Sequence, residues 1–206
     1  MRISDDRYNR DRLRLDLALR MIRHEARTCT IRTWTGLTDD RIRKLYRAYV
    51  QNDRSNPVRR HRGKSPSQVE FFLRNPGTLF EARTLGSLFS LWELLARTRS
   101  TLGPQSLSAS MERGTLFCTA YETYASLHRP ARISFEHAWF LLCALTRADE
   151  LRFEGCPGCG GVLLSDRLAE RRNTCPQCRD MHLVINLASR HATRGMQFDL
   201  WESAPV

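Results

Sequence analysis

Four cysteines near the C-terminal end of the chain form two pairs of identical spacing, and no other feature of the sequence limits the fold as strongly. The pairs Cys156/Cys159 and Cys175/Cys178 are both C-x-x-C, and residues 160–174 separate them. Zn²⁺ prefers tetrahedral thiolates, and a C-x-x-C turn places two sulfurs on one side of the ion. Because four thiolates close the coordination shell, the spacing predicts one structural zinc ion per chain rather than a catalytic one.

The residues around the first pair favour a zinc-ribbon-like module. Gly160 and Gly161 permit a tight reversal of the chain, and residues 162–164 and 183–187 are candidate short strands. A redox pair is the weaker alternative, because it needs one reactive pair on a helix N-terminus and leaves the second pair unexplained.

Structural disulfides are the third interpretation, and they need an oxidising compartment. No apolar stretch follows the charged N-terminal residues before Leu13, so we expect no secretory signal. The longest apolar run, from Ala138 to Leu145, is too short to span a bilayer. We therefore expect a cytoplasmic chain with reduced thiols and no membrane association.

Positive charge gathers in the first third of the sequence. Residues 1–64 hold 18 Lys and Arg against 8 Asp and Glu, a net charge of +10, whereas residues 65–206 carry a net +1. This segregation indicates a polyanionic partner, because neutralising phosphates releases condensed counterions. A coding bias explains why 31 of the 33 basic residues are arginine, but not why they are segregated.

Apolar periodicity predicts a mainly α fold, and a composition of 41% hydrophobic and 27% charged residues is typical of a globular domain. Residues 13–26 are expected to form a helix that is apolar on two sides and needs cover on both, from its own core or from a partner chain. One face carries Leu13, Leu17 and Met21, and the other carries Leu15, Leu19 and Ile22.

A helix is predicted from an N-cap at Thr38 to about residue 50, followed by a basic connector at residues 51–64. A capping box at Ser65 is expected to open a second helix that continues through Arg74. The two helices are a candidate helix-turn-helix, although this connector is longer than the usual three or four residues.

Within this segment the sequence suggests two kinds of DNA contact. Four side chains of the basic connector are candidate phosphate ligands: Arg59, Arg60, Arg62 and Lys64. Three residues of the second helix are candidates for contacting base edges: Ser67, Gln68 and Arg74. The alternative for the connector is a solvated charged loop.

Residues 77–149 are expected to hold three further helices with an aromatic core, the last of them capped by Ser134. The lone cysteines Cys29, Cys118 and Cys143 are expected to behave as small buried hydrophobic residues. The chain then divides into four segments: a partner-contacting helix in 1–36, a helix-turn-helix-like basic segment in 37–76, a helical core in 77–154 and a zinc-binding module in 155–206.

In this order, the features resemble the FlhC family of flagellar transcriptional activators over roughly residues 10–180. The stretches that carry the resemblance are LTDDRIRKLYRAY, SPSQVEFFL, CPGCGG and CPQC. The stretch SDRLAERRNT between the cysteine pairs lacks the histidine-containing segment of that family, so a diverged copy with other target operons is an alternative.

The resemblance implies a mostly helical protein that binds zinc through its four paired cysteines. It also implies a heterohexamer of two such chains with four small helical FlhD subunits, which binds promoter DNA and activates RNA polymerase. An RNA-binding or adaptor module carrying a zinc ribbon is the rival class of function. An enzyme is not expected, because no phosphate loop, open metal site or nucleophile motif is present.

Overall fold

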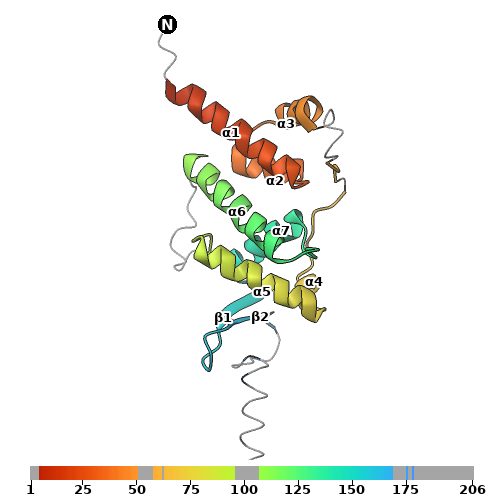
Figure 1. The fold of residues 1–206 in the computed structure, drawn as a ribbon, viewed down its shortest axis with the longest axis vertical. Coiled ribbons are helices and arrows are strands. Elements are labelled where there is room, and N and C mark those ends of the chain that lie inside the picture. The colour runs from red at the N-terminus through yellow and green to blue at the C-terminus, as the bar shows by residue number, and fades with distance from the viewer. Residues whose placement is uncertain are drawn as a thin grey trace, which may run out of the picture. The chain divides into compact units, whose positions relative to one another are not determined.

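The computed structural model describes residues 5–50, 58–61, 63–95, 107–168, 175 and 178. In this part of the chain, helices predominate and one two-stranded sheet is present (Figure 1). The elements are α1 (Asp5–Arg23), α2 (Thr28–Thr35), α3 (Asp39–Leu45), the π-helical turn η1 (Tyr46–Val50), α4 (Glu70–Leu73), α5 (Pro76–Leu91), α6 (Leu107–Leu127), α7 (Phe135–Arg147), β1 (Leu151–Gly155) and β2 (Val162–Asp166). The predicted mainly α fold is confirmed.

The chain divides into two compact units. The larger, which we call the helical unit, comprises Met1–Phe153 and Leu164–Ala169. The smaller, which we call the cysteine unit, comprises Glu154–Leu163 and Glu170–Val206. None of the helices in the described ranges is both long and apolar enough to cross a membrane.

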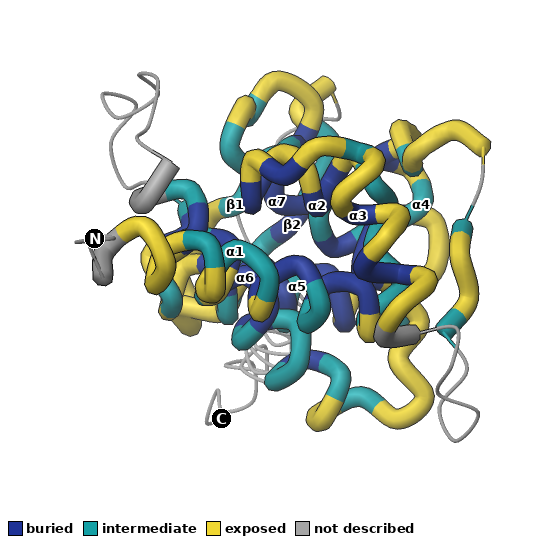
Figure 2. The backbone as a smooth tube through the Cα atoms, turned by 90° about the horizontal axis from the view of Figure 1, so that it is seen from above, coloured by how far each residue is buried: buried dark blue, intermediate teal, exposed yellow. Residues whose placement is uncertain are grey.

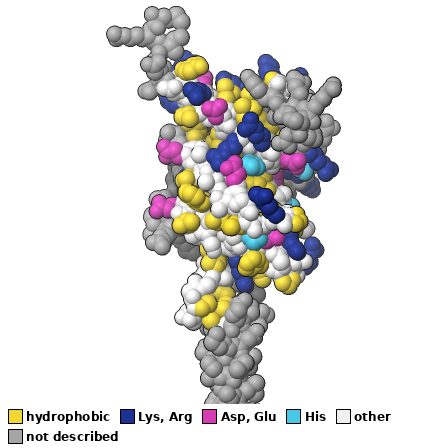
Figure 3. Space-filling view, viewed as in Figure 1, with side chains coloured by type: hydrophobic (Ala, Val, Ile, Leu, Met, Phe, Trp, Pro, Cys, Tyr) yellow, Lys and Arg dark blue, Asp and Glu magenta, His cyan; other side chains and the backbone are white. Residues whose placement is uncertain are grey.

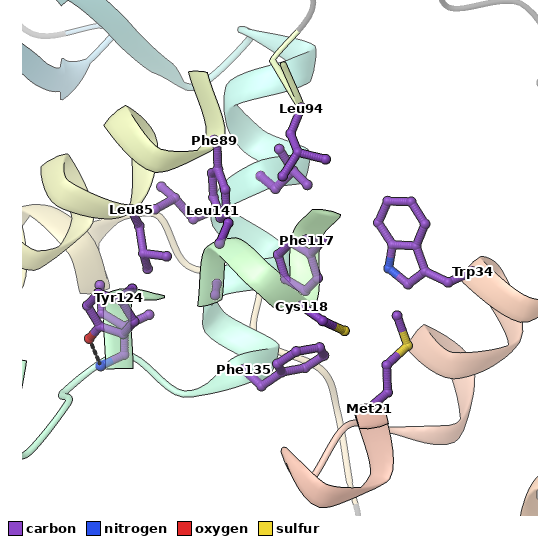
Figure 4. Close-up of a cluster of buried hydrophobic side chains, with 14 of the residues drawn as sticks. Met21, Trp34, Leu85, Phe89, Leu94, Phe117, Cys118, Tyr124, Phe135 and Leu141 are labelled. Carbon is purple, nitrogen blue, oxygen red and sulfur yellow. Dashed lines mark hydrogen bonds between the residues drawn. The ribbon is translucent and has the colours of Figure 1, made fainter. Parts of the chain in front are cut away.

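The core of the helical unit is aromatic and lies where α5, α6 and α7 meet the first two helices (Figure 4). Phe117 of α6 is fully buried, with ring centroids 5.0 Å from Phe135 of α7 and 5.7 Å from Phe89 of α5. Trp34 of α2 reaches the same cluster through Trp139, at 4.9 Å between centroids. The burial colours in Figure 2 show these helices turning their buried residues towards one another. The aromatic residues of the middle segment that recur at helical spacing thus lie in or against this core, as predicted, whereas Phe80 is exposed.

Side-chain caps fix where several helices begin. Thr38 accepts a hydrogen bond from the Arg41 amide at 3.4 Å, and Ser134 accepts one from the His137 amide at 3.4 Å. Both predicted N-caps are therefore confirmed. Asn75 caps α5 in the same way, with Pro76 in the first helical position.

A buried carboxylate ties the first two helices to the core. Glu136 is 6% exposed, accepts the Arg27 amide at 2.7 Å and accepts the Thr30 hydroxyl at 3.1 Å. Because a buried charge is stable only when it is hydrogen-bonded, these contacts fix the junction between α1 and α2 against α7. This junction positions the basic surface described below.

The structure corrects several sequence-based expectations. The helix expected from Ser65 through Arg74 is only Glu70–Leu73, and no side chain caps it. Neither α2 nor β1 was predicted. Cys118 is buried as expected, but Cys29 is exposed and Cys143 is only half-buried. The candidate strand at 183–187 lies outside the described residues, whereas residues 162–164 do fall in β2.

Both apolar faces of α1 meet the chain's own core to different degrees. Leu17, Met21 and Ile22 are buried, and Leu15 and Leu19 are partly buried against the same core. Leu13, one turn before Leu17, remains 57% exposed. Tertiary packing within this chain therefore covers the apolar residues in the C-terminal half of the helix and leaves its N-terminal half exposed.

Candidate metal centre and candidate nucleic-acid interface

The structure brings all four paired cysteines into one cluster in the cysteine unit. The sulfurs of Cys156, Cys159, Cys175 and Cys178 lie within 4.8 Å of one another, and those of Cys159 and Cys175 are 3.6 Å apart. A tetrahedral ion with metal–sulfur bonds of about 2.3 Å separates its sulfurs by about 3.8 Å. The four cysteines can therefore hold a metal ion.

Backbone amides point at these sulfurs. The Cys175 amide donates to the Cys156 sulfur at 3.3 Å, and the Cys178 amide donates to the Cys175 sulfur at 3.3 Å. The first of these hydrogen bonds is the main cause that lowers the pKa of Cys156 to about 6. Hydrogen bonds with Cys159 and Cys175, which the protonated Cys178 thiol donates, raise the pKa of Cys178 to about 12. A bound dication would favour the thiolate form of all four cysteines.

Glycines make the first cysteine turn possible. Gly160 adopts a left-handed φ of 69° and donates its amide to the Cys156 carbonyl at 2.7 Å. A Cβ on Gly158 would lie 3.1 Å from the Cys178 sulfur, and one on Gly161 would lie 3.2 Å from the Cys159 sulfur. Larger residues would therefore push sulfurs out of place, and the donor set fits a closed, four-sulfur metal site.

The basic connector is fixed to the helical unit by Glu25, a residue that sequence analysis missed. Glu25 lies just after α1 with a left-handed φ of 60°. Its carboxylate accepts the Arg59 amide at 3.2 Å and contacts Nε2 of His61 at 2.7 Å. One carboxylate thus holds two residues of the connector.

Two further side chains hold the connector at other points. The Tyr46 hydroxyl donates to the Val58 carbonyl at 2.7 Å, and the Arg27 guanidinium donates to the Gly63 carbonyl at 2.7 Å. The Arg60 guanidinium also lies 5.8 Å from the Tyr46 ring centroid, within reach of a cation–π interaction. The described part of the connector therefore has a defined path and is not the free loop that its composition suggests.

Several cations of this region lack an acidic partner. Among the described residues from Arg41 to Lys64, five exposed basic side chains form no ion pair with a described residue: Lys44, Arg47, Arg59, Arg60 and Lys64. Figure 3 shows Lys and Arg side chains scattered over the visible face of the helical unit, with Asp and Glu side chains among them. We call these five residues the basic surface; it can bind a polyanion without first breaking salt bridges.

The remaining DNA-contacting candidates lie in different settings. Arg62 is outside the described residues. Ser67 and Gln68 are exposed in the segment before α4, and Arg74 is exposed just after it. The structure therefore does not place these three on one face of a long helix.

The sequence held only a weak signal for the residues that hold the connector. Glu25 is the single acidic residue between positions 17 and 38, in a stretch that is otherwise neutral or basic. An isolated acid of this kind is a candidate partner for nearby cations, but the sequence does not say which ones.

The chain matches no model of a known protein family, and a search of curated proteins finds no significant similarity. The interpretation of both sites therefore depends on the residues themselves.

Proposed function

We propose that the chain is the DNA-binding subunit of a transcriptional activator, as its resemblance to the FlhC family implies. Its ligand is promoter DNA, its targets include flagellar operons, and it acts on RNA polymerase in the cytoplasm. The role is binding and not catalysis.

The observation that carries this proposal is the basic surface. The side chains of its five cations form no ion pair with a described residue. Contacts with Glu25, Arg27 and Tyr46 hold the backbone of the connector. A connector whose backbone is already held loses less conformational entropy when its cations meet phosphates, which favours a regular polyanion such as duplex DNA.

The rival RNA-binding function finds less support. Recognition of single-stranded RNA uses exposed aromatic side chains on which bases stack. Tyr46, the aromatic residue beside Arg60, is only 7% exposed. In the described ranges, the aromatic residues with large exposed fractions are Tyr8 on α1 and Phe80 on α5, away from the connector in sequence.

Zn²⁺ is the metal we propose for the four-cysteine cluster. Tetrahedral sets of four thiolates suit zinc, and such a closed shell leaves no position for a substrate. The ion would order the cysteine unit, because a structural zinc site supplies folding free energy directly.

A small helical FlhD-like subunit is the proposed protein partner, and its site is a groove between α1 and α6. The groove has a volume of about 610 Å³ and is mainly apolar, with Asp16, Arg20 and Glu112 as its charged side chains. Its apolar lining includes Leu13 and Leu116. An amphipathic helix with an apolar stripe would cover these leucines and satisfy the charges at the edges.

A salt titration of DNA binding tests the proposal. The full-length chain, with any subunit that copurifies, is titrated at several salt concentrations with two kinds of duplex. One kind carries sequences selected for binding to the chain, and the other is random. Replacing Arg59, Arg60, Arg62 and Lys64 together with alanine should flatten the slope of log affinity against log salt by about 3 to 4, at about 0.9 per phosphate contact. The loss should be similar for both duplexes, because phosphate contacts carry no sequence information.

Arg147→Ala is the control, since Arg147 is exposed on α7 and should leave the slope unchanged. An unchanged slope in the quadruple variant would remove the connector from the interface and point to Arg167, Arg171 and Arg172 instead. A chain that binds no duplex at all would contradict the proposed function.

A further inference from the structure

The turn between α2 and α3 is three residues long and tightly built. Gly36 has a left-handed φ of 66° and ends α2 by donating its amide to the Arg32 carbonyl at 2.9 Å. The Thr35 hydroxyl donates to the Ile31 carbonyl at 2.7 Å and accepts the Leu37 amide at 3.3 Å. Thr38 then caps α3. A three- to four-residue turn, often with a glycine, is the connection that defines a helix-turn-helix.

The packing around this turn is also that of a helix-turn-helix. Five positions on the inner sides of α2, the turn and α3 are buried: Ile31, Thr35, Leu37, Ile42 and Leu45. Helix α2 packs against both α1 and α3, and α1 packs against η1. Helix α2 is thus packed on α1, α3 is held through α2 and η1, and one side of α3 is exposed.

The free side of α3 and η1 is rich in donors. Arg41, Arg43, Lys44 and Arg47 are exposed. Arg43 lies 2.9 Å from Asp40 and Arg41 lies 4.0 Å from Asp11, whereas Lys44 and Arg47 form no ion pair with a described residue. Arginine and lysine are the side chains that most often contact guanine edges in the major groove.

We propose that α2 and α3 form a DNA-binding helix-turn-helix, and that α3 with η1 enters the major groove and contacts base edges through Arg43, Lys44 and Arg47. This inference rests on the proposed function and names a recognition helix for it. It replaces the helix-turn-helix predicted from the sequence, whose second helix was expected from Ser65 through Arg74. That helix is only the four-residue α4, which follows the turn at residues 36–38 by more than thirty positions.

The basic connector lies where such a helix needs phosphate contacts. Arg60 is above the Tyr46 ring at the end of α3, and Gly63 is held by Arg27 just before α2. The Ser65 hydroxyl is 3.8 Å from the sulfur of Cys29 in the first turn of α2. The connector therefore borders both helices, and its cations would hold the backbone beside the groove that α3 occupies.

Selection from a randomised duplex pool tests the inference with charge-preserving variants. The probe is a set of duplexes with a random central segment, and the protein is the full-length chain with any copurifying subunit. Arg43→Lys and Arg47→Lys keep the charge that attracts phosphates but lose the planar fork that contacts a guanine edge at two points. We expect each of the two to change the enriched sequence and to reduce discrimination between selected and scrambled duplexes by about 5- to 150-fold.

Arg59→Lys and Arg60→Lys are the matched controls, and both should enrich the wild-type sequence, since phosphates accept lysine as well. Unchanged thermal unfolding of all four variants would show that the fold is intact. If the α3 variants enrich the wild-type sequence with undiminished discrimination, or if changing Gln68 or Arg74 alters it instead, the recognition helix is not α3. Binding of all duplexes with equal affinity would also overturn this inference while leaving DNA binding intact. Failure to bind any duplex would overturn the proposed function as well.

Discussion

At the scale of single residues, Glu122 shows how one side chain joins distant parts of the fold. Its carboxylate on α6 accepts two hydrogen bonds from Arg20 of α1, at 2.8 and 2.7 Å, and contacts Nε2 of His24 at 2.8 Å. The hydrogen bonds from Arg20 are the main cause that lowers the pKa of Glu122 to about 2. The same contacts place α1 against α6 and so shape the groove proposed for the partner.

The lowered pKa predicts how stability changes with pH. Because the folded pKa of Glu122 lies below its usual value of 4.5, its contribution is fully present above about pH 5 and is lost as pH falls towards 2. Glu122→Gln should therefore unfold at a lower temperature near pH 7 and lose less stability than the wild type between pH 5 and 2. Thermal unfolding across this range measures the effect.

Glu112→Gln is the control for this prediction. Glu112 is exposed on the same helix and forms no ion pair with a described residue, so its variant should follow the wild-type pH profile. Parallel profiles for Glu122→Gln and the wild type would contradict the assigned role of the ion pair.

At the scale of elements, the conformation of the basic connector depends on the residues that hydrogen-bond to it, and Glu25 is one of these. Removing the Glu25 carboxylate frees the Arg59 amide and His61, and ordering each residue again on binding costs about 1 kcal/mol. Glu25→Ala should therefore weaken duplex binding by about 5-fold or more, although it removes a negative charge near the basic surface. Fluorescence anisotropy with a random duplex measures the affinity.

Whether Glu25→Ala lowers or raises the affinity for DNA shows whether Glu25 positions the connector or only adds negative charge near it. Glu70→Ala removes an exposed carboxylate that forms no ion pair with a described residue, and it should leave affinity equal or slightly higher. Hydrogen exchange of residues 58–64 should speed up only in the Glu25 variant. Tighter binding by Glu25→Ala would show that the carboxylate merely repels DNA.

The cysteine unit makes a separate prediction. Cys175→Ser removes a sulfur that lies 3.6 Å from that of Cys159 and accepts the Cys178 amide, so the variant should lose its metal. Metal analysis should give about one zinc per wild-type chain, and a chelator should unfold the cysteine unit alone. Cys29→Ser, which changes an exposed thiol outside the cluster, should keep full metal content. Wild-type protein purified without zinc, or a Cys175 variant that retains it, would end this proposal.

At the scale of the whole molecule, the groove between α1 and α6 is where we expect assembly. Leu13 is 57% exposed and lines the groove, so Leu13→Asp should abolish copurification of the small helical subunit while thermal unfolding of the isolated chain stays close to wild type. Leu91→Asp is the control, because Leu91 is 72% exposed on α5 and does not line this groove. Retention of the partner by the Leu13 variant, or its loss by both, would rule the groove out as the specific site.

Much of the helical unit could be predicted, because its signals are local. The caps at Thr38 and Ser134 and the apolar spacing of α5, α6 and α7 depend on residues within one or two turns of each other. The short α2 escaped prediction since it has no side-chain cap and only eight residues. The helix expected after Ser65 is only Glu70–Leu73, and the Ser65 hydroxyl instead lies 3.8 Å from the sulfur of Cys29, 36 positions away, a contact that no local pattern predicts.

The four-cysteine cluster and the segregation of charge could be predicted without the fold, since ligand spacing and the positions of charged residues are properties of the chain. Only tertiary structure decided how the basic region is built. Glu25 meets His61 across 36 positions, and Arg20 meets Glu122 across 102, so no local pattern could pair them. The assignment of α2 and α3 as the proposed helix-turn-helix likewise depends on burial in the folded chain. Ile31, Leu37 and Ile42 are buried, whereas the cations of α3 are exposed.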